Sequence, residues 1–130
     1  MFAVLQVSLK NNLDIADHLR LGEALQPLRG EDVLIIGSGF STHRDGVSAE
    51  DRCRFMSWFH DTLTNKTYSS EKRKQLLTDS QRESTFSYGH QRTEHFLPSL
   101  VACAAACYKP GIVLYEESTM NLFLSHVKFE

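Results

Sequence analysis

The chain has 130 residues, of which 42% are hydrophobic and 23% charged, a balance typical of one soluble globular domain. Its formal net charge of -2 gives no electrostatic basis for binding nucleic acid or an anionic membrane surface. No apolar run approaches the roughly 20 residues that a membrane-spanning helix needs. The first ten residues lack the basic region of a signal peptide. We therefore predict a single domain over residues 1–130, with neither a nucleic-acid nor a membrane partner.

The cysteine content predicts a reducing compartment. Three cysteines are an odd number and none belongs to a Cys-x-x-Cys motif, so a disulfide framework is not expected. Cys103 and Cys107 are four residues apart and would share one face of a helix. Small buried apolar side chains are the simpler interpretation of this pair, ahead of a metal site. The expected location is the cytoplasm.

The first forty residues predict a strand, a helix and a second strand. Residues 2–9 are apolar and β-prone, and residues 14–29 repeat apolar side chains at helical spacing. Asp14 is placed to cap this helix, and Gly30 is placed to end it. The apolar run 33–37 follows at once. Short connections between these elements favour a βαβ unit with parallel strand pairing.

The rest of the chain predicts helices followed by strands. Ser48, with Asp51 three residues later, resembles a helix cap, and residues 80–91 are polar and predicted to form a loop. The helix that ends near Tyr108 is apolar almost all round and should be buried. The predicted elements are helices over 49–64, 71–79 and 97–108, a strand over 112–115 and a further strand within 120–129. The fold class is α/β, with a βαβ-containing sheet flanked by helices.

The stretch 33–43 is the first candidate for chemistry. Four aliphatic residues read as a buried strand, and Gly37 and Gly39 then allow a sharp turn that leaves room for a ligand. His43 follows at the exit of this strand. Open α/β sheets place their ligands at the carboxyl ends of strands, and imidazole titrates near neutral pH. The pattern indicates a histidine site, without naming its reaction.

The other histidines divide into two groups. His90 and His95 lie in or beside a polar loop, where functional residues are common; their spacing of five differs from the four of a helical zinc pair. Gly37-Ser38-Gly39 lacks the third glycine of a dinucleotide fingerprint, and no Gly-x-Ser-x-Gly elbow is present. The remaining histidines are predicted to be ordinary surface or strand residues: His18, His60 and His126.

Two stretches carry a family resemblance. Val33-Leu-Ile-Ile-Gly-Ser-Gly-Phe-Ser-Thr-His43 resembles the strand–glycine–histidine signature of the class III extradiol ring-cleavage dioxygenases. His90-Gln-Arg-Thr-Glu-His-Phe-Leu-Pro98 resembles the helix entry of their 4,5-DOPA dioxygenase branch. The resemblance extends over nearly the whole chain and matches the carboxyl-terminal half of that fold.

The resemblance implies a reaction and residue roles. Fe(II) or Zn(II) would be the cofactor, and a catecholic small molecule and dioxygen would be the substrates of an oxidoreductase that opens the aromatic ring. His43 would act as acid or base or would instead contact the metal, and His90 would contact the substrate or orient the site. His95 and Glu94 would be metal ligands. Three small residues would line the substrate pocket: Ser38, Gly39 and Ser41.

The sequence also departs from the family pattern. Family members are about twice as long, and their amino-terminal half supplies two further metal-site histidines that nothing in this chain matches. Gln91 and Thr93 stand where the family usually has Pro and Glu. An open catalytic metal site needs about three protein ligands, and His95 with one neighbour falls short.

Three interpretations follow from this shortfall. The first is a dioxygenase or an inactive fragment of one, with the metal bound or absent in this chain alone. The second is a non-enzymatic α/β module that binds a partner or a metal. The third, a hydrolase using His43, is disfavoured because no serine or cysteine is placed as its nucleophile. Unpaired strand edges in such a half-domain predict a homo-oligomer or a missing amino-terminal half.

Overall fold

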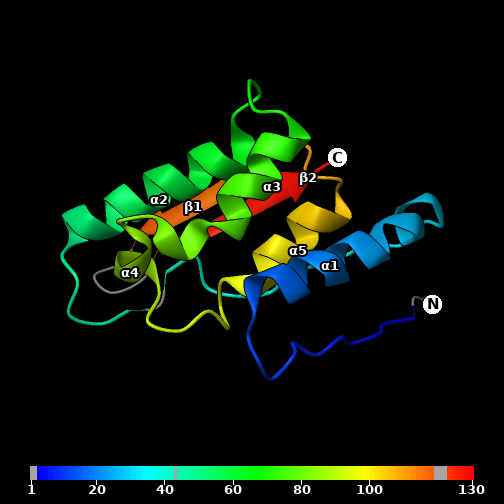
Figure 1. Ribbon diagram of the computed structural model, residues 1–130, viewed down its shortest axis with the longest axis horizontal. Helices are drawn as coiled ribbons and strands as arrows, with labels where there is room; N and C mark the ends of the chain where they lie inside the picture. The colour runs from blue at the N-terminus through cyan, green and yellow to red at the C-terminus, as the bar shows by residue number, and fades with distance from the viewer. Residues whose placement is uncertain (1–2, 43, 119–122) are drawn as a thin grey trace.

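The computed structural model of the chain describes residues 3–42, 44–118 and 123–130. These residues form helices and one small antiparallel sheet (Figure 1), which confirms the α/β class. None of the described helices is long and apolar enough to cross a membrane. In chain order the elements are α1 (Ile15–Leu25), the 3₁₀ helix η1 (Gln26–Gly30), α2 (Ala49–Thr64), α3 (Ser70–Thr78), the 3₁₀ helix η2 (Ser80–Arg82), α4 (Phe86–Gly89), α5 (Leu97–Ala105), β1 (Gly111–Ser118) and β2 (Phe123–Phe129).

The four longer helices form where the sequence pattern predicts them. The Asp14 side chain accepts a hydrogen bond from the Asp17 backbone N–H at 2.8 Å and thereby caps α1. Ser48 caps α2 in the same way, since its Oγ lies 3.1 Å from the Asp51 backbone nitrogen. α5 is buried, as its apolar composition predicts. The predicted loop 80–91 is not wholly irregular, because it contains η2 and α4.

The core lies between the helices. Phe55 of α2 is fully buried, and its ring lies 5.7 Å from that of Phe59 and 6.1 Å from that of Phe86. α1 and α5 lie side by side (Figure 1) and approach closely at Gly22, where a methyl group would collide with the Val101 carbonyl oxygen. Aromatic packing on one side and close helix contact on the other therefore fix the helical part of the fold.

Arg73 joins three parts of the chain inside the protein. Its side chain on α3 is fully buried. The guanidinium donates to the carbonyl oxygens of Thr62 at 2.8 Å and Tyr108 at 2.7 Å, and also to the Asn65 carbonyl oxygen. It thereby ties α3 to the end of α2 and to the turn after α5. Planar multidentate donation of this kind suits arginine and not lysine.

β1 and β2 form an antiparallel hairpin. Gly111 pairs with Phe129 and Val113 with Val127, and the register shifts between Val113 and Tyr115. One edge of β2 is therefore occupied by β1. These two strands are the only sheet among the residues that the structure describes.

The two amino-terminal strands are not formed, so the predicted βαβ pairing is wrong. Residues 3–9 and 33–40 are outside any helix or sheet, although α1 and η1 lie between them as predicted. Val4 is 90% exposed and Leu34 is 81% exposed. A strand needs a neighbour for its N–H and C=O groups, and among the described residues no backbone hydrogen bond joins residues 3–9 or 33–39 to another segment.

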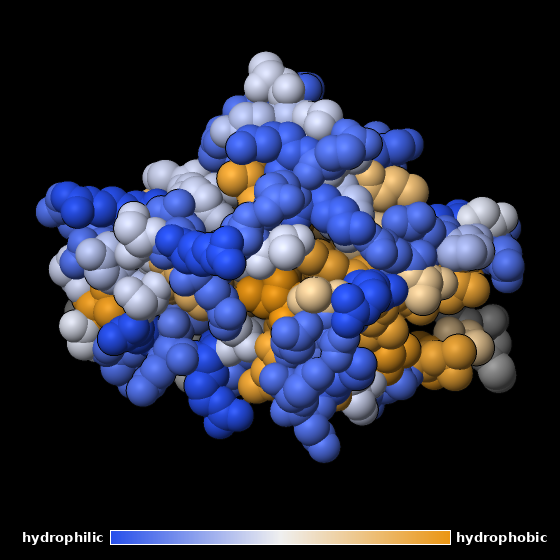
Figure 2. Space-filling view, viewed as in Figure 1, coloured by the Kyte–Doolittle hydropathy of each residue, from blue (hydrophilic) through white to orange (hydrophobic). Residues whose placement is uncertain are grey.

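Figure 2 shows the consequence on one face of the molecule. Hydrophobic side chains gather at the surface over α1, α5 and the amino-terminal segment, whereas the surface over α3 is mostly hydrophilic. The exposed large apolar residues fall mainly in the extended segments and in β1: Val4, Leu5, Val7, Val33, Leu34, Ile36, Phe40, Ile112, Leu114 and Tyr115.

Candidate functional site

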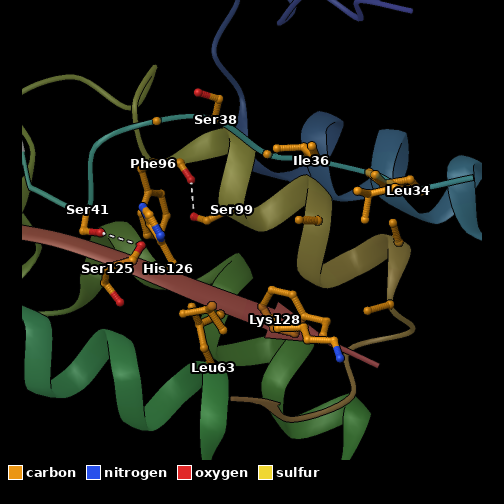
Figure 3. Close-up of a pocket in the computed structure, with 18 of the residues that line it drawn as sticks. Leu34, Ile36, Ser38, Ser41, Leu63, Phe96, Ser99, Ser125, His126 and Lys128 are labelled. Atoms are coloured by element: carbon orange, nitrogen blue, oxygen red, sulfur yellow. Dashed lines mark hydrogen bonds between the residues drawn. The ribbon is translucent and has the colours of Figure 1, made fainter. Parts of the chain in front are cut away.

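A cavity of about 590 Å³ lies between segment 33–41, α5 and β2 (Figure 3). This volume is within the range of small-molecule sites. The cavity has two ends, a site end and a slot end. The site end is lined by Ser38–Ser41, His95, Phe96 and His126, and the slot end by Val33–Gly37, Ala102, Ala105 and Val127–Phe129.

Two glycines place segment 33–41 against α5. A methyl group at Gly37 would collide with the Pro98 carbonyl oxygen, and one at Gly39 would collide with the His95 carbonyl oxygen. Only glycine permits this close approach of two backbones. The Gly-x-Gly spacing therefore serves to seat the segment on the start of α5.

The site end brings the two predicted motifs together. Ser38, Gly39 and Ser41 come from the first motif and His95 from the second, and all four line the cavity. The half-buried His95 ring meets the Phe40 ring edge-on, with 5.1 Å between centroids. Their roles as substrate-pocket and metal-site residues remain predictions.

His90 lies apart from this cavity. Its side chain is 3% exposed and its ring lies 5.4 Å from the rings of Phe55 and Phe96 and 6.0 Å from that of Phe86. It is not among the residues that line the cavity. The predicted contact between His90 and a substrate would require a path through this aromatic cluster, and it remains a prediction.

The predicted metal ligands do not form a complete set here. Glu94 is outside the cavity lining, and its carboxylate lies 3.6 Å from the Arg92 guanidinium. His43 lies outside the described residues. Within the described ranges, no three His, Cys, Asp or Glu side chains are grouped so that they could hold a metal ion. The described residues therefore do not by themselves fit the three-ligand site that the family chemistry requires.

Sequence reasoning missed His126. This residue lies on β2, lines the site end and has its ring 5.3 Å from that of Tyr115. It was predicted to be an ordinary strand residue, since a histidine in a strand gives no signal of its own. Only the fold shows that it lines the same cavity as His95.

The structure also corrects the prediction for His18. This side chain is fully buried instead of lying on the surface. Its Nδ1 donates to the Asp14 carbonyl oxygen at 2.6 Å, and its Nε2 accepts from the Lys10 backbone N–H at 3.0 Å. His18 therefore ties the chain before α1 to the first turn of that helix.

His60 is half-buried, and it too was predicted to be a surface residue. Its Nδ1 lies 2.8 Å from Glu116 Oε1, and its Nε2 lies 2.8 Å from Ser125 Oγ. Burial lowers the pKa of His60, against the opposing effect of the Glu116 charge. Burial thus favours the neutral ring, in which Nδ1–H donates to Glu116 while Nε2 accepts from the Ser125 hydroxyl.

These distances match those of a serine–histidine–acid relay. The Ser125 hydroxyl, however, points toward α2, where His60 holds it (Figure 3). On the cavity side, Ser125 offers its carbonyl oxygen, which accepts from Ser41 Oγ at 3.4 Å. The relay therefore fastens the hairpin to α2, and it places no nucleophile in the cavity.

The sequence is similar to those of three plant enzymes, although no protein-family model matches it. It is 38% identical over 111 residues to 4,5-DOPA dioxygenase extradiol of Beta vulgaris, covering 79% of this chain and 39% of that protein. The proteins of the same name from Portulaca grandiflora and Mirabilis jalapa are 36% and 29% identical over 110 and 123 residues. These matches cover 78% and 88% of this chain, and 39% and 44% of those proteins. The chain thus spans about two fifths of the length of the curated relatives it matches.

Proposed function

We propose that this chain, a relative of the extradiol dioxygenases over part of their length, supplies one wall of the substrate site of a ring-opening dioxygenase. The reaction would insert dioxygen into a catechol ring beside its two hydroxyl groups. A DOPA-like catechol is the substrate class suggested by the relatives' name. The observation that carries this proposal is the similarity to those relatives, together with the cavity that joins Ser38–Ser41 to His95.

The site end has the side chains that a catechol needs. Phe96 and Phe40 offer apolar surface to an aromatic ring. The Ser41 hydroxyl, which donates to the Ser125 carbonyl oxygen at 3.4 Å, is the hydroxyl we propose as a hydrogen-bond partner for a ring oxygen, because the Ser38 side chain points away from β2 (Figure 3). His95 lies at the same end, where its proposed role is that of a metal ligand. The proposed role of the chain is to bind and orient the ring, with His43, which lies outside the described residues, as the acid or base.

The proposed cofactor is Fe(II) or Zn(II), as the family resemblance implies. Such a metal would supply the activation of catechol and dioxygen that ring opening needs. Of the predicted ligands, His95 is the donor that the structure places in the cavity wall. Because the described residues contain no three-donor group, the remaining ligands would come from residues outside them. We therefore expect little or no ring opening by the isolated chain.

A second candidate is an α/β module that binds a partner or a metal without ring opening. The lack of a three-donor group among the described residues favours it. The two candidates differ in one measurable respect. An enzyme part must support turnover when its missing surroundings are restored, and a module has no such requirement.

The test restores those surroundings in a chimera. This chain replaces the matching 39% of the Beta vulgaris relative, and oxygen uptake and ring-opened product are measured with L-DOPA and added Fe(II). We expect ring opening, and we expect His95→Ala to lower kcat/KM by about 10- to 100-fold, the usual cost of disturbing a metal site. The exposed Gln91 from the same motif provides the control variant Gln91→Ala, which should keep the parent activity.

Two results would contradict the proposal. One is a chimera that folds, as judged by circular dichroism and its elution volume, and yet opens no ring. The other is a His95→Ala chimera as active as its parent, because the cavity would then contribute nothing to the reaction.

A further inference from the structure

We propose that the slot end of the cavity receives one extended β-strand from the part of the family fold that this chain does not span. The strand would lie between segment 33–37 and the free edge of β2. This inference goes beyond the proposed function because it requires no ring opening. It concerns how the chain recognises another stretch of polypeptide, whether that stretch belongs to a longer form of the same chain or to a separate one.

The first wall of the slot is held in place but has no partner. Gly37 and Gly39 seat it on α5, as described above. Among the described residues, no backbone hydrogen bond joins residues 33–39 to another segment. Leu34 and Ile36 are 81% and 76% exposed. An extended apolar segment whose backbone groups make no hydrogen bonds to another segment is the kind of edge to which a strand readily adds.

The second wall is the edge of β2 opposite β1. Near the start of β2 this edge already has a hydrogen-bonding partner, because the Thr42 backbone N–H donates to the Phe123 carbonyl oxygen at 3.2 Å. Beyond Ser125 it faces the cavity (Figure 3). The two walls thus meet at the site end and leave the slot end open.

Backbone edges line this opening. The cavity is lined by nine consecutive residues of one wall, 33–41, and five consecutive residues of the other, 125–129. Side chains of an extended chain alternate between faces, so a strand presenting one face would contribute every second residue. The two unbroken runs of lining residues therefore indicate that each wall turns its backbone edge toward the cavity. An inserted strand would therefore find N–H and C=O groups along these edges.

The floor of the slot leaves space for the side chains of such a strand. It is formed by Ala102 and Ala105 of α5, whose side chains are single methyl groups. A helix with small apolar residues beneath an open strand position is the arrangement expected where a sheet packs on a helix. The slot is therefore apolar on its floor and hydrogen-bonding on its edges.

The occupant follows from the length of the relatives. The chain spans 39% of two of them and 44% of the third, so more than half of each has no counterpart here. The open strand position lies in the same cavity as His95, the predicted metal ligand in its wall, and the residues that the structure describes contain no group of three donors to complete a metal site. One missing neighbour at this side of the fold accounts for both. A second copy of this chain would leave the donor shortfall unexplained, so we assign the slot to the unmatched part of the family fold.

The test co-expresses this chain with the Beta vulgaris relative from which the matching 39% has been removed. Complex formation is measured by co-purification, and hydrogen exchange is followed by mass spectrometry. We expect a complex in which the amides of residues 33–39 and 127–129 exchange at least about tenfold more slowly than in the chain alone. The covalent chimera gives a second measurement, because the same amides should be protected there even if the separate relative fragment is insoluble.

Two matched variants localise the contact. Ile36→Lys places a charge on the segment that forms the first wall of the slot, and Leu114→Lys places the same charge on β1, where the residue is 64% exposed and does not line the cavity. We expect Ile36→Lys to abolish the complex and the protection, and Leu114→Lys to keep both.

Three outcomes would overturn the inference. The first is the absence of protection at residues 33–39 in both the co-expressed complex and the chimera. The second is equal behaviour of the two lysine variants. The third is concentration-dependent protection of residues 33–39 in the chain alone, which would identify a second copy as the occupant. None of these readouts involves substrate turnover, so failure here is distinguishable from failure of the proposed dioxygenase function.

Discussion

The helical part of this protein and its extended segments differ in how far their apolar side chains and backbone groups find partners. α1, α2, α3 and α5 bury their apolar faces against one another, and Phe55, Leu77 and Leu100 are fully enclosed. Segments 3–9 and 33–40 are also rich in aliphatic residues, yet Val4 and Leu34 lie almost fully exposed. A helix makes its backbone hydrogen bonds within its own sequence, whereas a strand depends on a neighbour. A chain that spans part of its relatives can therefore keep its helices and lose its strand pairing.

The largest expected effect tests whether the helical part is self-sufficient. Arg73→Met removes a buried guanidinium and the three hydrogen bonds that it donates to the carbonyl oxygens of Thr62, Asn65 and Tyr108. We expect the free energy of unfolding to fall by about 3 kcal/mol or more, as for other broken buried networks. Urea denaturation measures this change.

The control for this variant lies one residue away on the same helix. Lys72 is exposed, so Lys72→Met should change the free energy of unfolding by less than about 0.5 kcal/mol. If Arg73→Met lowered the free energy of unfolding as little as Lys72→Met does, the stability of the helical part would come from contacts other than those of Arg73.

The same difference explains what the sequence could predict. Helix bounds follow from apolar spacing and from caps such as Asp14 and Ser48, and both caps are present as predicted. The predicted relationship with the extradiol dioxygenases is likewise confirmed by their sequence similarity. The predicted strands 2–9 and 33–37 failed because apolar content indicates a preference for burial and says nothing about which neighbour is present.

The candidate site was predictable only in part, for a related reason. Ser38, Gly39, Ser41 and His95 came from motifs, and the structure does bring them to one cavity. His126 and the environment of His90 depend on tertiary contacts between distant elements. Residue spacing along the chain carries no information about such contacts. Sequence motifs therefore located the cavity, and the fold was needed to show which histidines face it.

Two matched glycine substitutions, one in the helical part and one in an extended segment, should have intermediate effects on stability. Gly22→Ala and Gly37→Ala both direct a methyl group at a backbone oxygen of α5, that of Val101 and that of Pro98 respectively. Gly22 lies in the packed α1–α5 contact, so we expect a loss of about 1–3 kcal/mol from overpacking. Gly37 lies in the unpaired segment, which can move away, so its variant should cost less than about 1 kcal/mol.

The two variants should also differ in what moves. Hydrogen exchange should increase across α1 and α5 in Gly22→Ala, because that helix contact carries stability. In Gly37→Ala the core helices should keep their protection while the seat of segment 33–41 on α5 is lost. Similar losses of stability in both variants would show that the extended segment already belongs to the cooperative core.

The smallest expected effect concerns the joint between the two regions, where His60 of α2 holds Glu116 and Ser125 of the hairpin. Burial lowers the pKa of His60 in the folded protein, so the unfolded chain binds its proton first as the pH falls below about 6.5. The contribution of His60 to the free energy of unfolding is therefore present above that pH and decreases as the pH falls through the folded-state pKa.

His60→Gln removes this titration, so the free energy of unfolding of the variant should fall less than that of the parent between about pH 8 and about pH 5. Glu116→Gln removes the charge that opposes the shift and should make the loss steeper. Parallel pH profiles for all three proteins, measured by urea denaturation, would show that the hairpin is held to α2 by packing alone.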